Sequence, residues 1–383
     1  MVLAVYTKTS LDEIEKLVEE VFTEIEDKGI QYQSFENDIA PFGPEQLGRF
    51  VKIMPIQKGK TLNLAFRLPE SDADKYYKSG NYISHLIGHE SKGSILDLLS
   101  EEGLALELSS SWSHYEKYMS TLSIRIKLTK KGSSKENILK VISVVGAYLN
   151  MLRKEGPQEW VYEESKALSE LDFKYIDTTG GSDKCLSISS NYMTYEEPEN
   201  VLHNPYEYRG YKPEVIKKFQ ESLTPQNLLI YYINDELQLD DSYLTDPIYK
   251  TRYTNEAIRE DMLKAFEAGD VSWSKLEKKI HLPEKNEFIP RNFEVLPTSG
   301  PSCCLCKVRQ NEVSDLYFWQ DNKYLLPKAI SQMQVYVDPI VSLRSARNDS
   351  MLAIWIKLFQ DHIRSMSYMA EMAKVDLSIS RNT

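Results

Sequence analysis

The chain has 383 residues, of which 42% are hydrophobic and 27% are charged, a composition typical of a soluble globular protein. This length predicts two or three domains. The formal net charge of −11 argues against nucleic acid and anionic membranes as partners, and no apolar run reaches transmembrane length.

Two features favour a cytoplasmic location. The N-terminus has no basic segment followed by an apolar block, so no signal peptide is visible. There are only four cysteines, and three of them lie together as Cys303, Cys304 and Cys306. Without a nearby histidine these three are an incomplete zinc ligand set, so they are expected to be reduced thiols in a solvated loop. An exposed, reactive thiol cluster is the alternative.

Residues 1–45 predict a strand followed by an amphipathic helix. Val2–Tyr6 is apolar and indicates the strand, and Ser10 is a candidate N-cap with Glu13 at the capping-box position. Gly29 is expected to end the helix. One strand and one helix cannot bury the apolar stripe of this helix alone. The stripe consists of Leu11, Ile14, Leu17, Val18, Val21, Phe22 and Ile25. Pro41 and Pro44 then indicate a linker.

Two alternating stretches, 50–54 and 61–66, predict strands around a turn at Lys58–Lys60. The stretch from Tyr82 to Trp112 follows and predicts a helix, a break at Gly93 and a second helix. Gly103 is expected as the residue after that second helix. Leu104, Leu106 and Leu108 then alternate with smaller or polar residues, which indicates a strand.

The rest of the central region alternates between strand and helix patterns. Residues 119–128 predict a strand that pairs with 104–112 as a hairpin. Helices are predicted at 135–154, 158–174 and 213–223, and a buried strand at 228–233. The apolar stretch at 184–193 is a further helix candidate. Early strands, later helices and one returning strand predict an α+β fold, with helices packed on a mostly antiparallel sheet.

The C-terminal part predicts an extended segment followed by a new domain. Prolines within 286–312 disfavour a helix there. Gln332–Val337 indicates a strand, and Ser350–Ala373 indicates a long amphipathic helix.

His85 and His89 suggest a metal site at first sight, because histidines four residues apart share one helix face. Catalytic zinc helices have His-Glu-x-x-His or His-x-x-Glu-His. Here Glu90 lies outside the pair, and a third ligand is not evident. Hydrogen-bonded histidines in a half-buried face are the leading interpretation, and peptide-contacting histidines are the second.

Several segments carry a resemblance to a known family. His85–Glu90, which reads His-Leu-Ile-Gly-His-Glu, resembles the second domain of the insulin-degrading, pitrilysin-type (inverzincin) metallopeptidases. Further segments resemble this family in the family's order, and the resemblance covers nearly the whole chain. These segments are Gly93–Leu96, Gly103, Arg153–Trp160, Asn286–Pro290, Asn292–Pro297 and Leu326–Lys328.

The resemblance implies a metallopeptidase-type α/β roll and a division of the chain into four segments. Residues 1–45 correspond to the tail of the first domain, which holds zinc in the family. Residues 46–290 correspond to a second, inactive domain. Residues 291–312 correspond to an interdomain linker, and residues 313–383 to an incomplete third domain.

The resemblance also implies a zinc metallopeptidase as the parent protein, which degrades peptides in an enclosed chamber. None of the six histidines lies in a His-x-x-Glu-His motif. We therefore expect this chain to bind no zinc and to hydrolyse no peptide bond by itself.

In the family, the second domain anchors the N-terminal end of a peptide at an exosite, by strand addition. The matching positions in this sequence are His85, Gly88, Glu90, Leu108, Ser110 and Trp112. The sequence departs from the family at the strand. Ser110 and Ser111 stand where the family has two glycines, and Trp112 replaces a smaller polar residue, so affinity or preference is expected to differ. An ordinary polar strand edge is the alternative for these serines.

Two functions of different classes remain. The first is a fragment of the zinc peptidase that contributes the peptide exosite. The second is a catalytically inactive peptide-binding or assembly subunit that partners an active homologue. The expected partners are peptide substrates, the remaining domains of the parent and further copies of the chain. A metal-binding regulator is a weaker third reading because the ligand geometry is poor.

Overall fold

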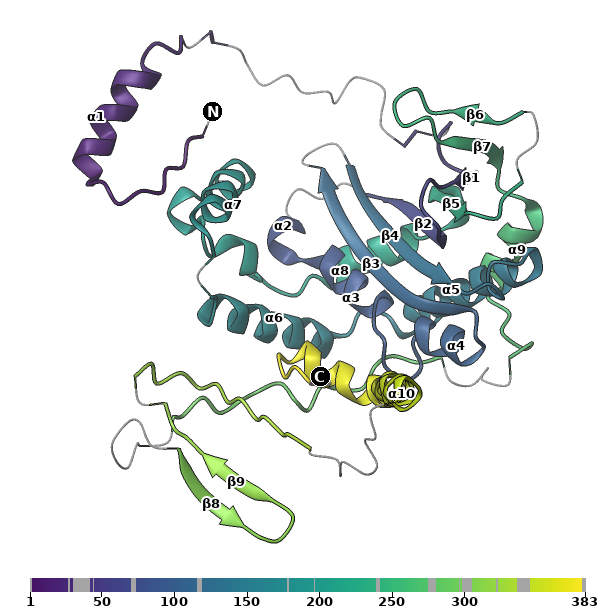
Figure 1. The fold of residues 1–383 in the computed structure, drawn as a ribbon. Helices are drawn as coiled ribbons and strands as arrows, with labels where there is room; N and C mark the ends of the chain where they lie inside the picture. Colours follow the sequence, from purple (N-terminus) through teal and green to yellow (C-terminus); the bar gives the residue numbers. More distant parts are fainter. Residues whose placement is uncertain are drawn as a thin grey trace. The chain divides into compact units, whose positions relative to one another are not determined.

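The structure is a computed structural model that describes residues 2–26, 28–29, 42–43, 45–69, 74–115, 119–177, 179–195, 197–238, 242–274, 280–295, 297, 305–321, 323–335 and 345–380. The chain forms two compact units, Met1–Lys285 and Asn286–Thr383 (Figure 1).

The first unit is built on a seven-stranded sheet with the strand order β3-β4-β2-β5-β1-β7-β6. All neighbours pair antiparallel except β1 and β5, which pair in parallel. The predicted α+β fold with a mostly antiparallel sheet is therefore confirmed. The strands are β1 (Arg49–Met54), β2 (Lys60–Leu68), β3 (Ala105–Tyr115), β4 (Met119–Leu128), β5 (Leu228–Asn234), β6 (Leu244–Thr245) and β7 (Arg252–Ala257).

The core lies between this sheet and the helices on one of its faces. In the register of β2 and β4, Leu64 faces Ile124 and Phe66 faces Leu122, and all four side chains are inaccessible to solvent. Helix α3 packs on β3 and β4, and α8 packs on β2, behind the strands in Figure 1. The covering helices are α3 (Ser79–Ile87), α4 (Ile95–Glu101), α5 (Lys135–Glu155), α6 (Glu159–Lys174), α8 (Pro213–Ser222) and α9 (Glu260–Ala268).

The remaining elements of the first unit are shorter or more exposed. They are α1 (Leu11–Phe22), α2 (Asp74–Tyr77), α7 (Gly181–Thr194) and the 3-10 turns η1 (Pro198–Asn200), η2 (Asn204–Tyr206) and η3 (Pro225–Asn227). Ser10 and Glu13 form the predicted capping box of α1. No residue of α1 is buried, so no other element covers its apolar stripe fully. This agrees with the expectation that residues 1–45 cannot bury the stripe by themselves.

The second unit contains a two-stranded antiparallel sheet and one long helix. Strand β8 (Cys306–Gln310) pairs with β9 (Asp315–Phe318), and α10 spans Ala346–Met372. Within this unit, the Asn286 side-chain amide donates to the carbonyl of Met369 at 2.7 Å. None of the helices in the described parts of either unit is long and apolar enough to cross a membrane.

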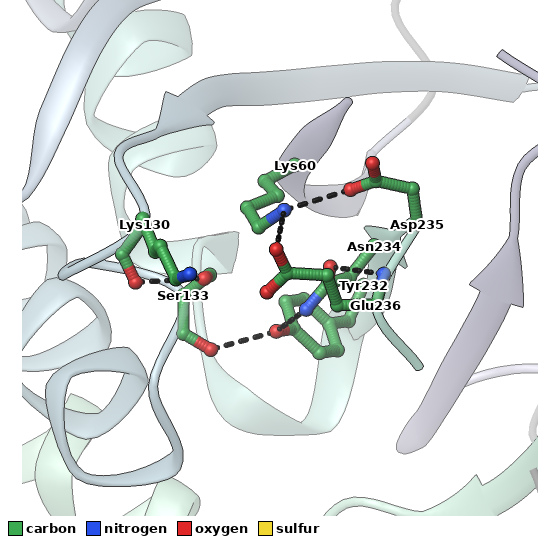
Figure 2. A network of polar contacts seen from close by, with 7 residues as sticks. All are labelled: Lys60, Lys130, Ser133, Tyr232, Asn234, Asp235 and Glu236. Atoms are coloured by element: carbon green, nitrogen blue, oxygen red, sulfur yellow. Dashed lines mark hydrogen bonds and ion pairs between the residues drawn. The ribbon is translucent and has the colours of Figure 1, made fainter. Parts of the chain in front are cut away.

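A polar network fixes the end of the central strand β5 (Figure 2). Lys60 Nζ of β2 lies 2.7 Å from Asp235 Oδ1 and 3.3 Å from Glu236 Oε1. The Tyr232 hydroxyl donates to the carbonyl of Ser133 at 2.7 Å and accepts from the Asn234 amide at 2.6 Å. The network joins β5 to β2 on one side and to the turn before α5 on the other.

Several predictions about elements were wrong. Val2–Tyr6 is not in a strand, and α1 ends at Phe22, before Gly29. Leu106 is 49% exposed, because a bulge between Ala105 and Glu107 shifts the alternation of β3 by one residue. Strands β6 and β7 and helix α9 were not predicted.

Other predictions fall partly or wholly outside the described residues. Gln332–Val335 is not in a strand, and the last two residues of the strand predicted at 332–337 lie outside the described ranges. The described ranges also leave out the predicted linker prolines Pro41 and Pro44, as well as Cys303 and Cys304. Cys306 is exposed at the start of β8 and is not in a disulfide.

Candidate functional site

Helix α3 begins over a buried carboxylate. Asp74 is inaccessible to solvent and accepts hydrogen bonds from the backbone N–H groups of Ser79 (2.8 Å) and Gly80 (2.9 Å). The first N–H groups of a helix have no partner within the helix, and a negative charge is favourable at this end of the helix dipole. Asp74 thereby fixes where α3 starts.

Strand β3 forms one edge of the seven-stranded sheet. It pairs with β4 along its length, and no strand in the described part of the chain pairs with its other side. In an antiparallel ladder, every second residue of an edge strand directs its backbone N–H and C=O groups outward. The outer side of β3 therefore offers donors and acceptors to another extended chain.

Helix α3 lies against one face of this edge strand. Leu108, Ser110 and Trp112 share a face of β3, because the side-chain period of a strand is two. The helix touches the strand at both of its ends, and the approach is unusually close at Gly80. A Cβ atom on Gly88 would lie 3.4 Å from Ser110 N, and one on Gly80 would lie 2.5 Å from Trp112 Cδ1. The structure thus brings Gly88 next to Ser110 and places Trp112 against the other end of α3, while Leu108 shares their face of the strand.

His85 and His89 lie near the C-terminal end of α3. His85 is in its last turn, whereas His89 follows the helix by two residues, so the prediction of two histidines on one helix was wrong for His89. The rings meet edge to face, with centroids 5.4 Å apart. Nδ1 of His89 accepts a hydrogen bond from Ser91 N–H at 3.2 Å and lies 2.8 Å from the Ser91 hydroxyl.

Both imidazoles are uncharged at neutral pH. Burial lowers the pKa of His85 to about 4. Burial and, to a smaller extent, the neighbouring His85 lower the pKa of His89 to about 3. A charged imidazole is unfavourable where water is excluded.

Two histidines alone are too few ligands for a zinc ion. A zinc ion in a protein takes at least three ligands from side chains. The described ranges contain no group of three or more His, Cys, Asp or Glu side chains that could hold a metal ion. His89, two residues beyond α3, is hydrogen-bonded through Nδ1 to Ser91.

Glu90 lies in the loop between α3 and α4 and is partly exposed. The loop is ordered by local caps. The Ser94 hydroxyl accepts from Asp97 N–H at 3.1 Å, and the Asp97 carboxylate accepts from Gly93 N–H at 2.9 Å. Gly93 has φ +83°, a conformation that favours glycine. Gly88 caps the C-terminal end of α3, and Glu90 lies between this cap and the ordered turn at Gly93.

Two residues of this contact were not predicted as part of the site, namely Gly80 and His114. The His114 ring stacks on Trp112 with centroids 5.7 Å apart and an angle of 20° between the planes. Its Nδ1 lies 3.0 Å from the Ser120 hydroxyl on β4. The period of two from Trp112 to His114 was a usable signal, and so was a glycine inside a helical pattern.

The Ser110 hydroxyl and the Trp112 indole N–H are buried and have no hydrogen-bond partner among the residues that the structure describes. An unpaired buried donor costs about 1–3 kcal/mol. Within the described residues, the Ser110 side chain therefore adds no hydrogen bond that would stabilise the fold.

Two family models cover almost the whole chain. Residues 1–169 match the model described as peptidase M16 inactive domain. Residues 173–383 match the model described as middle or third domain of peptidase M16.

The chain is also similar to curated proteins. It is 32% identical to insulin-degrading enzyme of Homo sapiens over 384 residues, which cover 97% of this chain and 35% of that protein. It is 30% identical to insulin-degrading enzyme of Drosophila melanogaster over 388 residues, covering 99% and 37%. It is 28% identical to nardilysin of Rattus norvegicus over 387 residues, covering 99% and 32%. The chain thus spans about a third of the length of these relatives.

Among solved structures, the crystal structure of pitrilysin has the same fold. Its TM-score with this chain is 0.76 at 21% sequence identity, and the match covers 96% of this chain and 38% of that chain.

Proposed function

The chain belongs to the insulinase-like peptidase M16 family, and from this we propose that it is the non-catalytic, peptide-anchoring part of an insulin-degrading-type zinc metalloendopeptidase. The parent enzyme encloses peptide substrates in a chamber and cleaves them with a zinc-bound water supplied by another domain. In this proposal, residues 1–45 end the first domain and residues 46–290 form the second. Residues 291–312 are a linker, and residues 313–383 begin the third domain. A cytoplasmic location is part of the same proposal.

The free edge of β3 beside α3 is the observation that carries this proposal. An extended peptide that adds to such an edge gains main-chain hydrogen bonds, and neighbouring side chains select the sequence. Gly88, at the C-terminal end of α3, lies beside Ser110. The helix and the strand edge together form the two sides of a site for one extended chain.

Glu90 is proposed to hold the N-terminal amine of the bound peptide. A hydrogen bond between a carboxylate and an ammonium group contributes about 1.5–3 kcal/mol. His85, which is neutral at pH 7, is proposed to contact the same end of the peptide through a neutral hydrogen bond. The Leu108 side chain is 5% exposed and anchors β3 in the hydrophobic core.

The experiment is peptide binding by fluorescence anisotropy, with one labelled extended peptide in free and N-acetylated forms. We expect saturable binding that is about tenfold weaker after acetylation, because the ammonium partner of Glu90 is then lost. The Glu90→Gln variant should bind both forms equally weakly. Glu136→Gln is the matched control, since Glu136 is exposed on α5 and pairs with Lys140 one turn away.

Two results would contradict the proposal. One is equal affinity of the wild-type chain for both peptide forms together with no effect of Glu90→Gln. The other is binding that a chelator abolishes, because the proposal assigns no metal to this chain.

The second candidate is an inactive subunit that binds peptides or partners an active homologue. The uncovered apolar stripe of α1 favours it, because assembly with a partner protein buries such a face. Chelator-sensitive peptide hydrolysis by the complete parent protein would rule this candidate out.

A further inference from the structure

The last residues of the first unit, 280–285, form a segment without regular secondary structure. Ile280 and Leu282 pack against the hydrophobic core of the unit, whereas His281 between them is exposed. Core contacts on both sides of His281 fix the backbone at this point. The imidazole is therefore presented from a fixed position on the surface of the unit.

The His281 ring lies against the backbone of Gly93, in the loop that joins α3 to α4. A Cβ atom on Gly93 would come within 2.5 Å of Nε2, 2.6 Å of Cδ2 and 2.7 Å of Cε1 of this ring. The imidazole thus occupies the space that a side chain at position 93 would take, and Gly93 is buried. The backbone N–H of His281 also donates to the carbonyl of Gly93 at 3.2 Å. Ring and backbone therefore hold the same loop residue.

A hydrogen bond fixes the orientation of the ring. Nδ1 of His281 lies 2.7 Å from the carbonyl oxygen of Leu282. A carbonyl oxygen can only accept, so Nδ1 carries the proton and donates it to this bond. The opposite edge of the ring, with Nε2, is left facing Gly93. The contact with the loop is thus made by a ring whose rotation is restricted.

The loop held in this way is the one that carries Glu90. It runs from Gly88, the C-cap of α3, to Ser94, the N-cap of α4, and Glu90 lies three residues before Gly93. His281 is far away in the sequence and ties this short loop to another part of the unit. A charge-assisted hydrogen bond requires a short distance between donor and acceptor, so a small displacement of the loop weakens it.

We infer that His281 is a positioning residue for the peptide anchor: by holding the loop at Gly93, it sets how strongly the site prefers a peptide with a free N-terminus. The inference rests on the peptide-anchoring function proposed above. The second unit begins at Asn286, directly after the segment that contains His281. Recognition of the peptide N-terminus therefore depends on the segment that leads into the second unit.

The first test compares the affinities of His281→Ala for the free and the N-acetylated peptide. We expect the ratio of the two affinities to fall from about tenfold to about threefold or less, because Glu90 is no longer held in place. The affinity for the acetylated peptide should stay unchanged, because that peptide binds without an ammonium group. A general loss of structure would weaken the binding of both forms alike and would contradict the inference.

Three further variants make this result specific. His281→Phe keeps a planar ring over Gly93 and should retain the wild-type ratio. Gly93→Ala places a Cβ atom where the ring lies and should lower the ratio as His281→Ala does. Lys285→Gln is the matched control, because Lys285 belongs to the same segment but lies over the Trp160 ring, 5.9 Å from its centroid. It should bind both peptide forms like the wild-type chain.

Hydrogen exchange followed by mass spectrometry tests the same contact without peptide. The amides of residues 88–94 should exchange faster in His281→Ala than in the wild-type chain, whereas those of β3 should not change. Thermal melting shows whether each variant is folded. If His281→Ala does not fold, His281→Gln compared with His281→Phe answers the same question, because only phenylalanine supplies a ring.

Unchanged exchange in this loop, or an unchanged ratio of affinities, would overturn the inference and leave the proposed function standing. Failure of the wild-type chain to bind either form of the peptide would instead overturn the proposed function, and this inference with it.

Discussion

Two imidazoles near the end of α3 show how local burial sets the charge of the site. His89 is only 3% exposed, and its Nδ1 accepts from the Ser91 backbone. Protonation at Nδ1 would break this hydrogen bond and place a charge where water is excluded, in line with the lowered pKa of about 3. In the unfolded chain the same ring titrates near pH 6.5. The folded state therefore binds fewer protons than the unfolded state in the acid range.

This difference predicts a loss of stability as the pH falls below about 6.5. A histidine with a lowered folded-state pKa stabilises the fold fully above its unfolded pKa and progressively less below it. The slope is about 1.4 kcal/mol per pH unit for one fully buried histidine. The variant His89→Asn keeps an acceptor for Ser91 N–H but does not titrate. Its free energy of unfolding should fall less steeply between about pH 6.5 and 5.

The measurement is a series of urea unfolding curves at different pH values. His362→Asn serves as the control, because His362 is exposed on α10. Identical slopes for the wild-type chain and His89→Asn would refute the assignment of this pH dependence to His89.

At the scale of the elements, helices α5 and α9 pack closely because residue 146 of α5 is a glycine. A Cβ atom on Gly146 of α5 would overlap the carbonyl oxygen of Phe266 on α9 and lie 2.8 Å from its carbonyl carbon. Both atoms belong to the backbone, so a rotamer change cannot relieve the overlap. The two helices pack at this distance only with glycine at position 146.

Gly146→Ala is therefore expected to destabilise the first unit by about 1–3 kcal/mol, since the helices must separate. Helix propensity alone predicts the opposite sign, a gain of up to about 1 kcal/mol. Thermal melting followed by circular dichroism distinguishes the two. Gly59→Ala is the control because a Cβ atom there has nothing within 4 Å. A raised melting temperature for Gly146→Ala would contradict the prediction, because it would mean that α5 and α9 separate at little cost in free energy.

The elements also show what a sequence alone can reveal. Periodicity predicted the hairpin of β3 and β4 and helices α5 and α6, because their buried and exposed positions alternate regularly. It missed β7, whose sequence is mostly polar and whose residues are mostly exposed. The bulge at Leu106 has no sequence signal of its own, and it reversed the predicted orientation of that residue.

The same limit applies to the candidate site. The segments that hold it were evident from residues 85–90 and 108–112, because each segment is a local sequence string. The meeting of Gly80 with Trp112 was not evident, because it joins a helix to a strand far along the chain. Local patterns identify the elements, and only the packing shows which of their residues touch.

At the scale of the whole molecule, the chain combines a well-buried sheet with uncovered apolar surface. The exposed fractions of Leu11, Leu17 and Val21 on α1 are 85%, 53% and 57%. Apolar residues on one side of an exposed helix favour association with another apolar face. The chain by itself is therefore expected to form dimers or larger species at micromolar concentration.

Analytical ultracentrifugation checks this expectation. Replacing Leu11 and Val21 by glutamate should shift the population towards the monomer. Lys16→Glu is the control, because Lys16 is exposed on α1 outside the apolar stripe. A sharp monomer mass for the wild-type chain would contradict the prediction.

The parallel pairing of β1 with β5 also governs the order in which the chain becomes structured during synthesis. Arg49 pairs with Leu229, and β5 separates β1 from β2 in the sheet. When β1 and β2 leave the ribosome, the strand that must lie between them has not yet been made. Contacts between distant parts of a sequence slow folding and prolong the exposure of strand edges. In a nascent chain, the sheet therefore stays incomplete between β1 and β2 until translation has passed Asn234. A product that ends at the boundary between the two family models lacks the central strand β5.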